Sequence, residues 1–295
     1  MIWHIIMDKT EDKNSTKIVR EAGLDKFYTK INISKMCIDE VEKYVKLSNF
    51  DLIIEPSAGN GSFYSQIQHK NKIGIDILPE LDVLIKKDFL LYIPPKKNNK
   101  ILVIGNPPFG KVSSLAVKFF NHSSIWADTI AFIIPRTFRR ISVQNQLSLD
   151  FHLLHDIDIP TTPCSFEPPM SVKCCFQIWV KRNQKREIIT LPIIHNSWDF
   201  LPLGPLDDKK QPTPPVNADF ALRAYGGNCG EIFDENLSKL RPKSYHWIKT
   251  NIDKQILIKQ FKKLDYSISK NTARQNSIGK AELVKLYSDK YNLPT

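Results

Sequence analysis

Short apolar runs of strand length alternate with longer stretches of helical spacing through the first two thirds of the chain. Ile38, Val41 and Val45 recur at helical spacing before the first run, and Ser34 is a suitable N-cap for that helix. The apolar runs cover residues 52–54, 72–75, 101–104, 129–134 and 172–180. Because parallel strands need long crossover connections, this alternation predicts an α/β fold with a parallel sheet.

The sequence changes character near residue 200, where prolines interrupt a polar stretch. These are Pro202, Pro205, Pro212, Pro214 and Pro215. Such a stretch cannot form one regular element, so residues 200–216 are predicted to be a linker. Two domains follow from this: residues 1–203, and a small basic region at 204–295. Within the second, residues 248–261 and 283–287 have helical spacing, and residues 205–295 hold 16 Lys and Arg against 10 Asp and Glu.

Composition narrows the class of protein and of partner. Hydrophobic residues make up 42% and charged residues 25%, as in globular proteins, and the net charge of +11 favours a polyanionic partner. No run of 18 apolar residues is present, so no membrane span is expected. The five cysteines form no Cys-x-x-Cys pair, which argues against a zinc site or any other metal site. We expect a monomer or homodimer in a reducing compartment, cytoplasmic or nuclear.

A glycine-bearing turn follows the first apolar run, in Glu55-Pro56-Ser57-Ala58-Gly59-Asn60-Gly61. Glycines at 59 and 61 allow a tight turn and a close approach of the backbone to a ligand. Tyr64 stands where a dinucleotide fingerprint needs its third glycine, and the turn is not a phosphate-binding P-loop. Alone, the turn is either an ordinary loop or a cofactor site; Asp76, which ends the next run, favours a nucleoside cofactor whose ribose it could bind.

The run at 101–104 leads directly into Gly105-Asn106-Pro107-Pro108-Phe109. Two prolines fix φ and remove two backbone donors, so the turn is rigid and offers carbonyl acceptors. Asn106 adds a side-chain acceptor, and Phe109 adds a ring that could stack on a base. An exocyclic amine could donate to Asn106 and to the Pro107 carbonyl. Elsewhere the same turn would be an ordinary surface turn, but after the glycine turn and Asp76 it indicates amine chemistry.

With these motifs in place, the chain resembles the class I S-adenosylmethionine-dependent amino-methyltransferases, and more narrowly the gamma-class N6-adenine DNA methyltransferases. The resemblance covers residues 27–182. It rests on Glu55–Gly61, on Asp76, on Asp88-Phe89, on Asn106–Phe109 and on Phe27-Tyr28-Thr29-Lys30 upstream. It implies a Rossmann-like seven-stranded methyltransferase sheet, and it leaves residues 204–295 as a target recognition region.

The resemblance also implies a role for each cofactor residue. Glu55, Ala58, Gly59 and Gly61 would shape the S-adenosylmethionine pocket. Asp76 would hold the ribose hydroxyls. Asp88 would accept a hydrogen bond from the amine of the cofactor's adenine, with Phe89 packed beside that ring. Tyr28 and Thr29 would face the carboxylate end of the cofactor.

The activity that the resemblance implies is methyl transfer to N6 of adenine in DNA, with Asn106, Pro107, Pro108 and Phe109 as the catalytic motif. In a duplex the adenine must first be flipped out, to stack on Phe109. Phe166 is either a second base-stacking aromatic or a buried core residue. The motif serves any planar NH2 group, so adenine in RNA, the guanine N2 amine and a protein glutamine amide are alternative acceptors. A non-catalytic nucleic-acid-binding subunit is the alternative outside the enzymes.

Basic and glycine-rich segments supply the expected substrate contacts. Arg223 lies in Phe220–Gly230, a segment with three glycines that is either a nucleic-acid-binding loop or a turn between strands. Arg136 and Arg139 are expected to line the substrate groove with other basic residues, some of which are merely solvated. Those others are Arg140, Lys181, Arg182, Lys185 and Arg186.

Overall fold

The protein is described here by a computed structural model, which covers residues 26–95 and 100–291. The described chain forms two compact units: the first holds residues up to 134 together with 147–186, and the second holds 135–146 together with 187–295. Strand β10 (Trp198–Phe200) pairs with β13 (Tyr245–Thr250), so it belongs to the sheet of the second unit. The second unit therefore begins earlier in the chain than the recognition region expected from the sequence.

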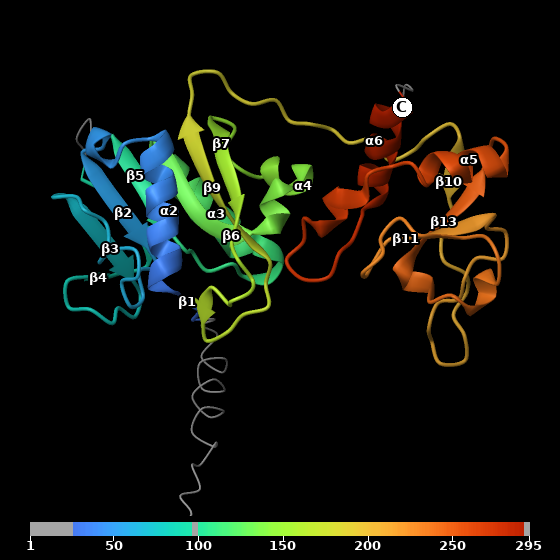
Figure 1. The fold of residues 1–295 in the computed structure, drawn as a ribbon, viewed down its shortest axis with the longest axis horizontal. Coiled ribbons are helices and arrows are strands. Elements are labelled where there is room, and N and C mark those ends of the chain that lie inside the picture. Colours follow the sequence, from blue (N-terminus) through green and yellow to red (C-terminus); the bar gives the residue numbers. More distant parts are fainter. Residues whose placement is uncertain (1–25, 96–99, 292–295) are drawn as a thin grey trace, which may run out of the picture. The chain divides into compact units, whose positions relative to one another are not determined.

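The predicted seven-stranded sheet is present in the first unit (Figure 1). Neighbouring strands run in the order β4-β3-β2-β5-β6-β9-β7. Strands β4, β3, β2, β5 and β6 are parallel, and β7 is antiparallel to β9. Their bounds are β2 Leu52–Pro56, β3 Lys72–Asp76, β4 Ile85–Lys86, β5 Ile101–Gly105, β6 Thr129–Pro135, β7 Phe151–Asp158 and β9 Cys174–Lys181. This is the Rossmann-like α/β architecture expected from the alternating pattern.

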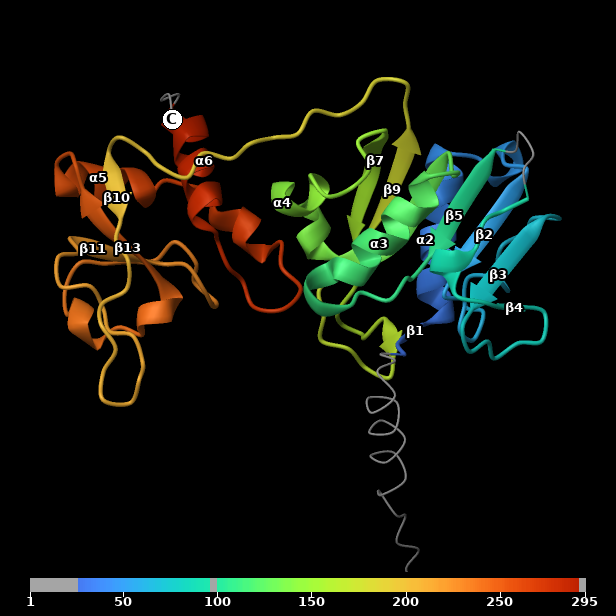
Figure 2. The ribbon, with the colours of Figure 1, turned by 180° about the vertical axis from the view of Figure 1, so that it is seen from behind.

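Helix α2 (Ile31–Tyr44) covers one face of this sheet, and α3 (Ser114–Ser124) covers the other, as Figures 1 and 2 show from opposite sides. The apolar positions of α2 pack on alternate residues of the central strands, including Ile53, Leu102 and Ile104. Ser34 is not the N-cap, as the spacing suggested, because the helix begins at Ile31. Its hydroxyl instead donates to the Ser62 carbonyl (2.9 Å) and ties α2 to the segment after the glycine turn.

Aromatic rings fill the opposite face of the sheet. Phe120 of α3 contacts Phe151 and Trp179 edge to face, with ring centroids 5.7 and 5.5 Å apart. Phe89 stacks on Phe119 at 5.1 Å. Edge-to-face and offset-stacked rings add to the free energy gained by burying apolar area. The remaining elements between residues 26 and 173 are β1 Tyr28–Thr29, η1 Leu47–Asn49, η2 Phe89–Leu91, η3 Lys111–Ser113, η4 Arg136–Arg139, α4 Ile141–Gln144 and β8 Phe166–Glu167; η4 and α4 belong to the second unit.

The second unit is built on a four-stranded sheet in the order β10-β13-β11-β12, in which all pairs are antiparallel. It also contains β11 Phe220–Arg223, β12 Ile232–Phe233, η5 Leu237–Lys239, η6 Pro242–Ser244, α5 Lys254–Phe261, η7 Tyr266–Lys270 and α6 Lys280–Tyr291. The helix predicted over 283–287 is confirmed as part of α6.

The prediction that a helix begins at Ile248 was wrong. Ile248 lies in β13, and α5 begins at Lys254, where Asp253 accepts a capping hydrogen bond from the Ile256 N–H (2.9 Å). Neither described range contains a helix long and apolar enough to cross a membrane.

Trp198 is the centre of the apolar core of the second unit. Its side chain is 1% exposed, stacks on His195 with ring centroids 4.3 Å apart, and meets Phe261 and Tyr287 edge to face. Residues from β10, α5 and α6 therefore converge on one indole ring. This packing explains how a small sheet and two short helices form a compact unit.

We predict that Trp198→Ala lowers the free energy of unfolding by about 3–5 kcal/mol, because it leaves a large cavity between β10, α5 and α6. Chemical denaturation followed by circular dichroism measures this change. Ile125→Ala is the control: Ile125 is 71% exposed, and its loss should cost less than about 0.5 kcal/mol. Equal effects of the two substitutions would contradict this account of the core.

Candidate active site

The carboxyl ends of β2, β3 and β5 bring three sequence motifs to one edge of the first-unit sheet. The glycine turn follows β2, Asp76 ends β3, and Asn106 follows β5. These strands are parallel neighbours, with Glu55 opposite Gly74 and Ile54 opposite Val103. In an open parallel sheet, ligands bind at this edge.

The glycine turn needs left-handed backbone at three positions. Ser57, Gly59 and Gly61 have φ of 54°, 51° and 77°. A Cβ on Gly61 would lie 2.5 Å from Leu81 Cδ1, so both backbone conformation and space favour glycine there. Residues 59–66 form a series of turns rather than a helix. The Lys72 ammonium closes the series by donating to the Tyr64 and Ile67 carbonyls (2.7 and 3.0 Å).

Asp76 fixes the glycine turn to the end of β3. One carboxylate oxygen accepts from the Gly59 N–H (2.8 Å) and the other from the Leu78 N–H (2.7 Å). The residue is 8% exposed. A carboxylate can accept about four hydrogen bonds, so two bonds to the backbone leave lone pairs available for hydroxyl groups of a ligand.

Glu55 is a buried carboxyl at the same edge. It is 3% exposed, and its Oε2 accepts from the Tyr64 N–H (2.7 Å). Burial raises the pKa of Glu55 to about 8, and the nearby Asp76 acts in the same direction. Gly105 makes room for it, because a Cβ at that position would lie 3.2 Å from Glu55 Cγ. The Glu55 side chain therefore packs against Gly105, the residue before Asn106.

The segment Lys26–Lys30, which we call the strap, closes over the glycine turn. Its strand β1 pairs with β8, with Thr29 opposite Phe166, and Thr29 is 5% exposed. The Tyr28 ring lies 3.1 Å from the position of a Cβ on Gly59, and its hydroxyl donates to Glu80. Burial and the Glu80 carboxylate raise the pKa of Tyr28, which keeps this hydroxyl a donor.

Asn106 presents an unused acceptor at the edge of the sheet. Its Nδ2 donates to the Phe27 carbonyl of the strap (3.4 Å), which orients the amide. Its Oδ1 is buried, and no donor within residues 26–95 and 100–291 reaches it. No main-chain N–H in those ranges donates to the Pro107 carbonyl either. A buried acceptor without a partner costs about 1–3 kcal/mol, so this site favours a ligand that donates.

Phe109 is half-buried beside the apolar core under α2, and Phe166 is fully part of that core at 2% exposure. The Phe109 carbonyl accepts from the Leu115 and Ala116 N–H groups (3.2 and 3.3 Å), which holds the turn against the start of α3. Phe109 therefore keeps ring surface for a ligand. Phe166 is buried, as expected for a core residue. Base stacking by Phe166 stays a prediction.

Asp88 and Phe89 point to different surroundings. Asp88 is exposed, and its Oδ1 accepts from the Leu90 N–H (2.9 Å), so it caps η2. Phe89 is 2% exposed and packs against Phe119, His122 and Trp126. A contact of Asp88 with a cofactor adenine stays a prediction, and Phe89 lies in the aromatic core.

Three arginines predicted to contact substrate, Arg136, Arg139 and Arg223, belong to the second unit, whereas Arg182 and Arg186 of the same predicted set belong to the first. Arg136 and Arg139 lie on η4. The Arg223 guanidinium pairs with Glu231 (3.1 Å) and lies over the rings of Phe233 and Tyr245, 5.3 and 5.6 Å from their centroids. These contacts give Arg223 a structural role within its unit, and nucleic-acid contacts of the three arginines stay predictions.

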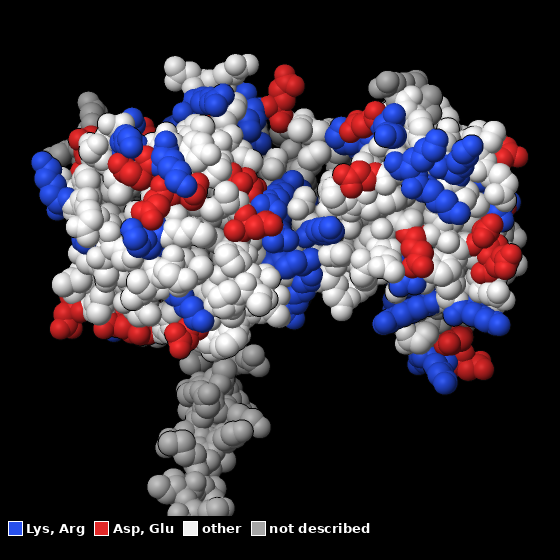
Figure 3. Space-filling model, viewed as in Figure 1, with Lys and Arg blue, Asp and Glu red and all other residues white. Residues whose placement is uncertain are grey.

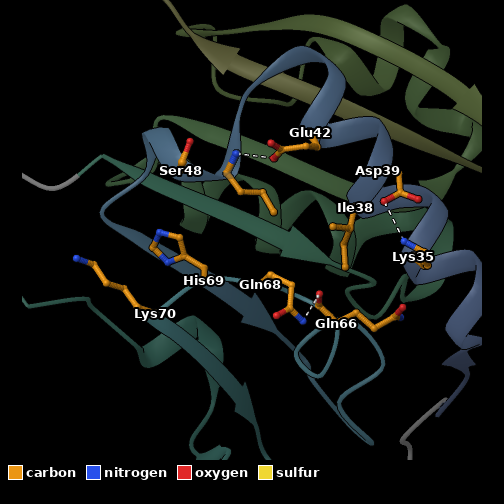
Figure 4. A pocket seen from close by; sticks show the side chains of 10 residues that line it. Lys35, Ile38, Asp39, Glu42, Ser48, Gln66, Gln68, His69 and Lys70 are labelled. Carbon is orange, nitrogen blue, oxygen red and sulfur yellow. Dashed lines mark hydrogen bonds and ion pairs between the residues drawn. The ribbon is translucent and has the colours of Figure 1, made fainter.

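A groove of about 530 Å³ lies elsewhere on the first unit, between α2 and the loop at 66–70 (Figure 4). Three of its charged side chains have partners: Lys35 pairs with Asp39 (3.3 Å), and Glu42 accepts from the Leu47 N–H (2.8 Å). The motifs described above do not line it. It therefore adds no residue to the candidate active site.

Sequence reasoning missed Glu80 and the Phe27 carbonyl. Glu80 anchors Tyr28 and also pairs with Lys26 (3.4 Å), and its N–H donates to the Gly59 carbonyl (3.1 Å). Glu80 lies in no recognisable motif. Phe27 lies in the upstream segment that carries the resemblance, but nothing in the sequence marks its carbonyl as a partner of Asn106. Only the three-dimensional position of the strap reveals them.

No family model matches the sequence, and no curated protein matches it. Solved structures that are similar to it include the 23S rRNA methyltransferase ErmE, with 14% identity over 55% of this chain and 71% of that one, and a TM-score of 0.38. The N-methyltransferase NodS of Bradyrhizobium japonicum WM9 has 10% identity over 52% and 98%, with a TM-score of 0.37. Magnesium protoporphyrin IX methyltransferase of Synechocystis PCC 6803, with bound SAM, has 10% identity over 61% and 100%, with a TM-score of 0.38. Those activities are properties of those proteins.

We predict that Glu55→Gln removes a pH-dependent loss of stability. The folded pKa of Glu55, about 8, lies above the ordinary value of 4.5, so its contribution to stability is complete below about pH 4.5. That contribution is lost as the pH rises through about 8. The amide oxygen can still accept from the Tyr64 N–H. Wild type and variant should unfold at similar urea concentrations at pH 5, and the variant should be more stable at pH 9.

The control for this prediction is Asp82→Asn, an isosteric change at an exposed carboxylate of the same unit. Its urea midpoint should follow that of the wild type at pH 5, 7 and 9. Parallel pH profiles for wild type and Glu55→Gln would mean that burial does not raise the pKa of Glu55.

Proposed function

We propose that this protein transfers a methyl group from S-adenosylmethionine to the N6 amine of adenine in DNA. The observation that carries the proposal is the buried Asn106 Oδ1, which has no donor among the described residues. It stands on a turn stiffened by two prolines, at the ligand-binding edge of the sheet. An exocyclic amine supplies two N–H donors in one plane, as this acceptor and the Pro107 carbonyl require.

The residues at the edge fit the cofactor. The Gly59 and Gly61 positions keep side chains out of the turn, and the buried Asp76 carboxylate retains acceptor capacity for the ribose hydroxyls. Tyr28 and Thr29 of the strap would border the methionine end, and Glu55 would lie beneath it. When bound, S-adenosylmethionine supplies a methyl carbon on a positively charged sulfur, so no separate activation of the methyl group is needed.

The chain's own contribution is alignment and polarisation of the amine. Hydrogen bonds from the amine to Asn106 Oδ1 and to the Pro107 carbonyl draw its nitrogen toward tetrahedral geometry, which frees the lone pair from the base ring. That lone pair would attack the methyl carbon that bound S-adenosylmethionine supplies, and the electrons of the S–C bond would stay on sulfur. The methylated nitrogen would then release its proton to solvent, so no low-pKa base is required.

Asn106 needs a fixed amide orientation for this task. Its Nδ2–H bond to the Phe27 carbonyl assigns Nδ2 to the strap and Oδ1 to the amine. The strap is held in turn by β8 and by the Tyr28 contact with Glu80. We therefore treat Phe27 and Tyr28 as positioning residues, which act through Asn106.

The Phe109 ring supports stacking of a flipped adenine, which offsets a cost of a few kcal/mol for extruding the base. The net charge of +11 supports nucleic acid over a protein amide as substrate. On the face in Figure 3, Lys and Arg side chains gather in patches over the second unit. A separate basic unit after the catalytic motif supports DNA over RNA.

We predict that Asn106→Ala lowers methylation by about 10³-fold, because one of the two acceptors for the amine is lost. Asn106→Asp should lose about 10- to 100-fold: its carboxylate still accepts from the amine but cannot donate to the Phe27 carbonyl. The assay is transfer of a tritiated methyl group to DNA. Calorimetry should give a cofactor Kd within about threefold of wild type for Asn106→Ala.

Asn49→Ala is the control, because Asn49 is an exposed asparagine of the same unit. Its activity should equal that of the wild type. Near-normal turnover by Asn106→Ala would refute the assigned chemistry. Mass spectrometry of nucleosides from DNA and RNA, and of peptides from protein, identifies the methylated acceptor. N2-methylguanosine as the product would refute adenine as the acceptor, and methylated protein would refute a nucleic acid substrate.

A further inference from the structure

Two polar segments that are distant in the sequence form one surface on the second unit. The Gly226 N–H donates to the Asn276 carbonyl (2.9 Å), and Asn276 Nδ2 donates to the Gly227 carbonyl (3.4 Å). Tyr225 and Ser277 form an isolated antiparallel bridge. Residues 224–230 and 271–277 therefore lie side by side, and we call them together the paired loops.

Arg140 fixes the second of the paired loops at both ends. Its guanidinium donates to the Asn271 carbonyl (2.7 Å) and to the Ser277 carbonyl (2.5 Å), and it pairs with Glu282 (3.3 Å). The side chain of Arg140 is 15% exposed. The loop is thus held by a nearly buried, charge-assisted anchor and has a defined shape before any ligand binds.

Arg223 anchors the first loop in a similar way. The Gly230 N–H donates to the Arg223 carbonyl (2.9 Å), and the guanidinium pairs with Glu231 and lies over the rings of Phe233 and Tyr245. Glu231 and Glu282 are therefore both neutralised by internal arginines. The exposed charge that remains at the tip of the second loop is that of Arg274.

The side chains that the paired loops expose are those that recognise nucleic acid bases. Tyr225 is 50% exposed, and Asn228, Arg274 and Gln275 are exposed as well. Their side chains make no hydrogen bond or ion pair within the part of the chain that the structure describes. Arginine and the carboxamides form paired hydrogen bonds with base edges, and tyrosine stacks on bases or packs on methyl groups.

The backbone requires glycine at only one of the two adjacent glycine positions of the first loop. Gly226 has φ of +103°, a conformation that side chains rarely adopt. Gly227 has no such conformation, and a Cβ on it would meet nothing within 4 Å. The fold therefore explains glycine at 226 but not at 227. Absence of a side chain at 227 leaves the backbone open to close approach by a ligand.

We infer that the paired loops are the surface that reads the base sequence of the DNA substrate. Arg274 and Gln275 contact base edges in the major groove, Tyr225 and Asn228 contact neighbouring bases, and Gly227 lets the duplex approach the backbone. The inference rests on the proposed function, and it assigns target specificity to named residues of the second unit.

The first test compares Arg274→Ala and Gln275→Ala with Lys262→Ala, which removes a charge from an exposed position at the end of α5 in the same unit. The target site is mapped by locating N6-methyladenine in methylated plasmid DNA. We expect each loop variant to lose about 10- to 100-fold in affinity for a duplex with that site, measured by fluorescence anisotropy. Affinity for an unrelated duplex should change by less than about threefold, and methylated sites should include altered sequences.

Lys262→Ala should lower the affinity for both duplexes equally and by less than about threefold, as expected for loss of a charge that contacts phosphate or solvent. Loss of affinity by the same factor for both duplexes in Arg274→Ala and Gln275→Ala would overturn base reading. Unchanged affinity and unchanged site choice in these variants would overturn the surface altogether.

The second test separates binding from folding. Gly227→Leu should keep the melting temperature of wild type, because space is open, yet lose about 10-fold or more in affinity for the duplex. Gly226→Ala is the matched control and should lower the melting temperature, because its φ is positive. Normal duplex affinity of a folded Gly227→Leu variant would contradict close approach at this position.

The outcomes also separate this inference from the proposed function. If the wild type methylates DNA and the loop variants behave like wild type, the inference fails and the methyltransferase proposal stands. If the wild type methylates no nucleic acid, the preferred duplex is selected by binding from a pool of random duplexes. Loss of affinity for that duplex alone in the loop variants would then uphold the surface and refute the proposed chemistry.

Discussion

The candidate active site depends on the Asp76 carboxylate, which joins the glycine turn to the end of β3. Its two oxygens accept from the Gly59 and Leu78 N–H groups, so one buried carboxylate satisfies a backbone donor of the glycine turn and another just after β3. This fixed turn carries the contact between Gly59 and the Tyr28 ring, and the strap that includes Tyr28 orients Asn106 through the Phe27 carbonyl. Groups from four separate segments therefore share a single geometry, as a reaction that relies on alignment requires.

The parts of this site that sequence could predict are those with local chemistry. Glycines at 59 and 61 have the positive φ that a tight turn needs, and Asn106 follows a strand because a proline pair cannot continue one. The resemblance pointed to Tyr28 and Thr29, but the contacts of the strap could not be predicted: Thr29 pairs with Phe166 through a two-residue strand, and no sequence pattern joins segments so far apart. Nothing in the sequence distinguishes Glu80 from other exposed acids until the Tyr28 hydroxyl is placed beside it.

The second unit illustrates how tertiary pairing overrides spacing. Ile248, Ile252 and Ile256 recur every four residues, as in a helix, yet Ile248 pairs with Phe200 and Phe220 in the four-stranded sheet. The sheet gains ladder hydrogen bonds and buries Ile248 completely, which one helical stripe could not provide. In the same unit Arg140 and Arg223 pair with Glu282 and Glu231, so the side chains left without partners among the described residues are exposed polar ones such as Arg274 and Gln275.

The division of the chain into units has a consequence for how the protein can be taken apart. Residues 135–146 leave the seven-stranded sheet after β6, belong to the second unit, and return to β7. Arg140, within this excursion, takes its partners from Asn271, Ser277 and Glu282. A truncation at residue 186 would therefore strand a guanidinium without its acceptors in the middle of the surviving fragment. The second unit is discontinuous in the chain. Isolating the first unit therefore requires replacing residues 135–146 with a short, neutral connection between β6 and β7, and isolating the second unit requires keeping them.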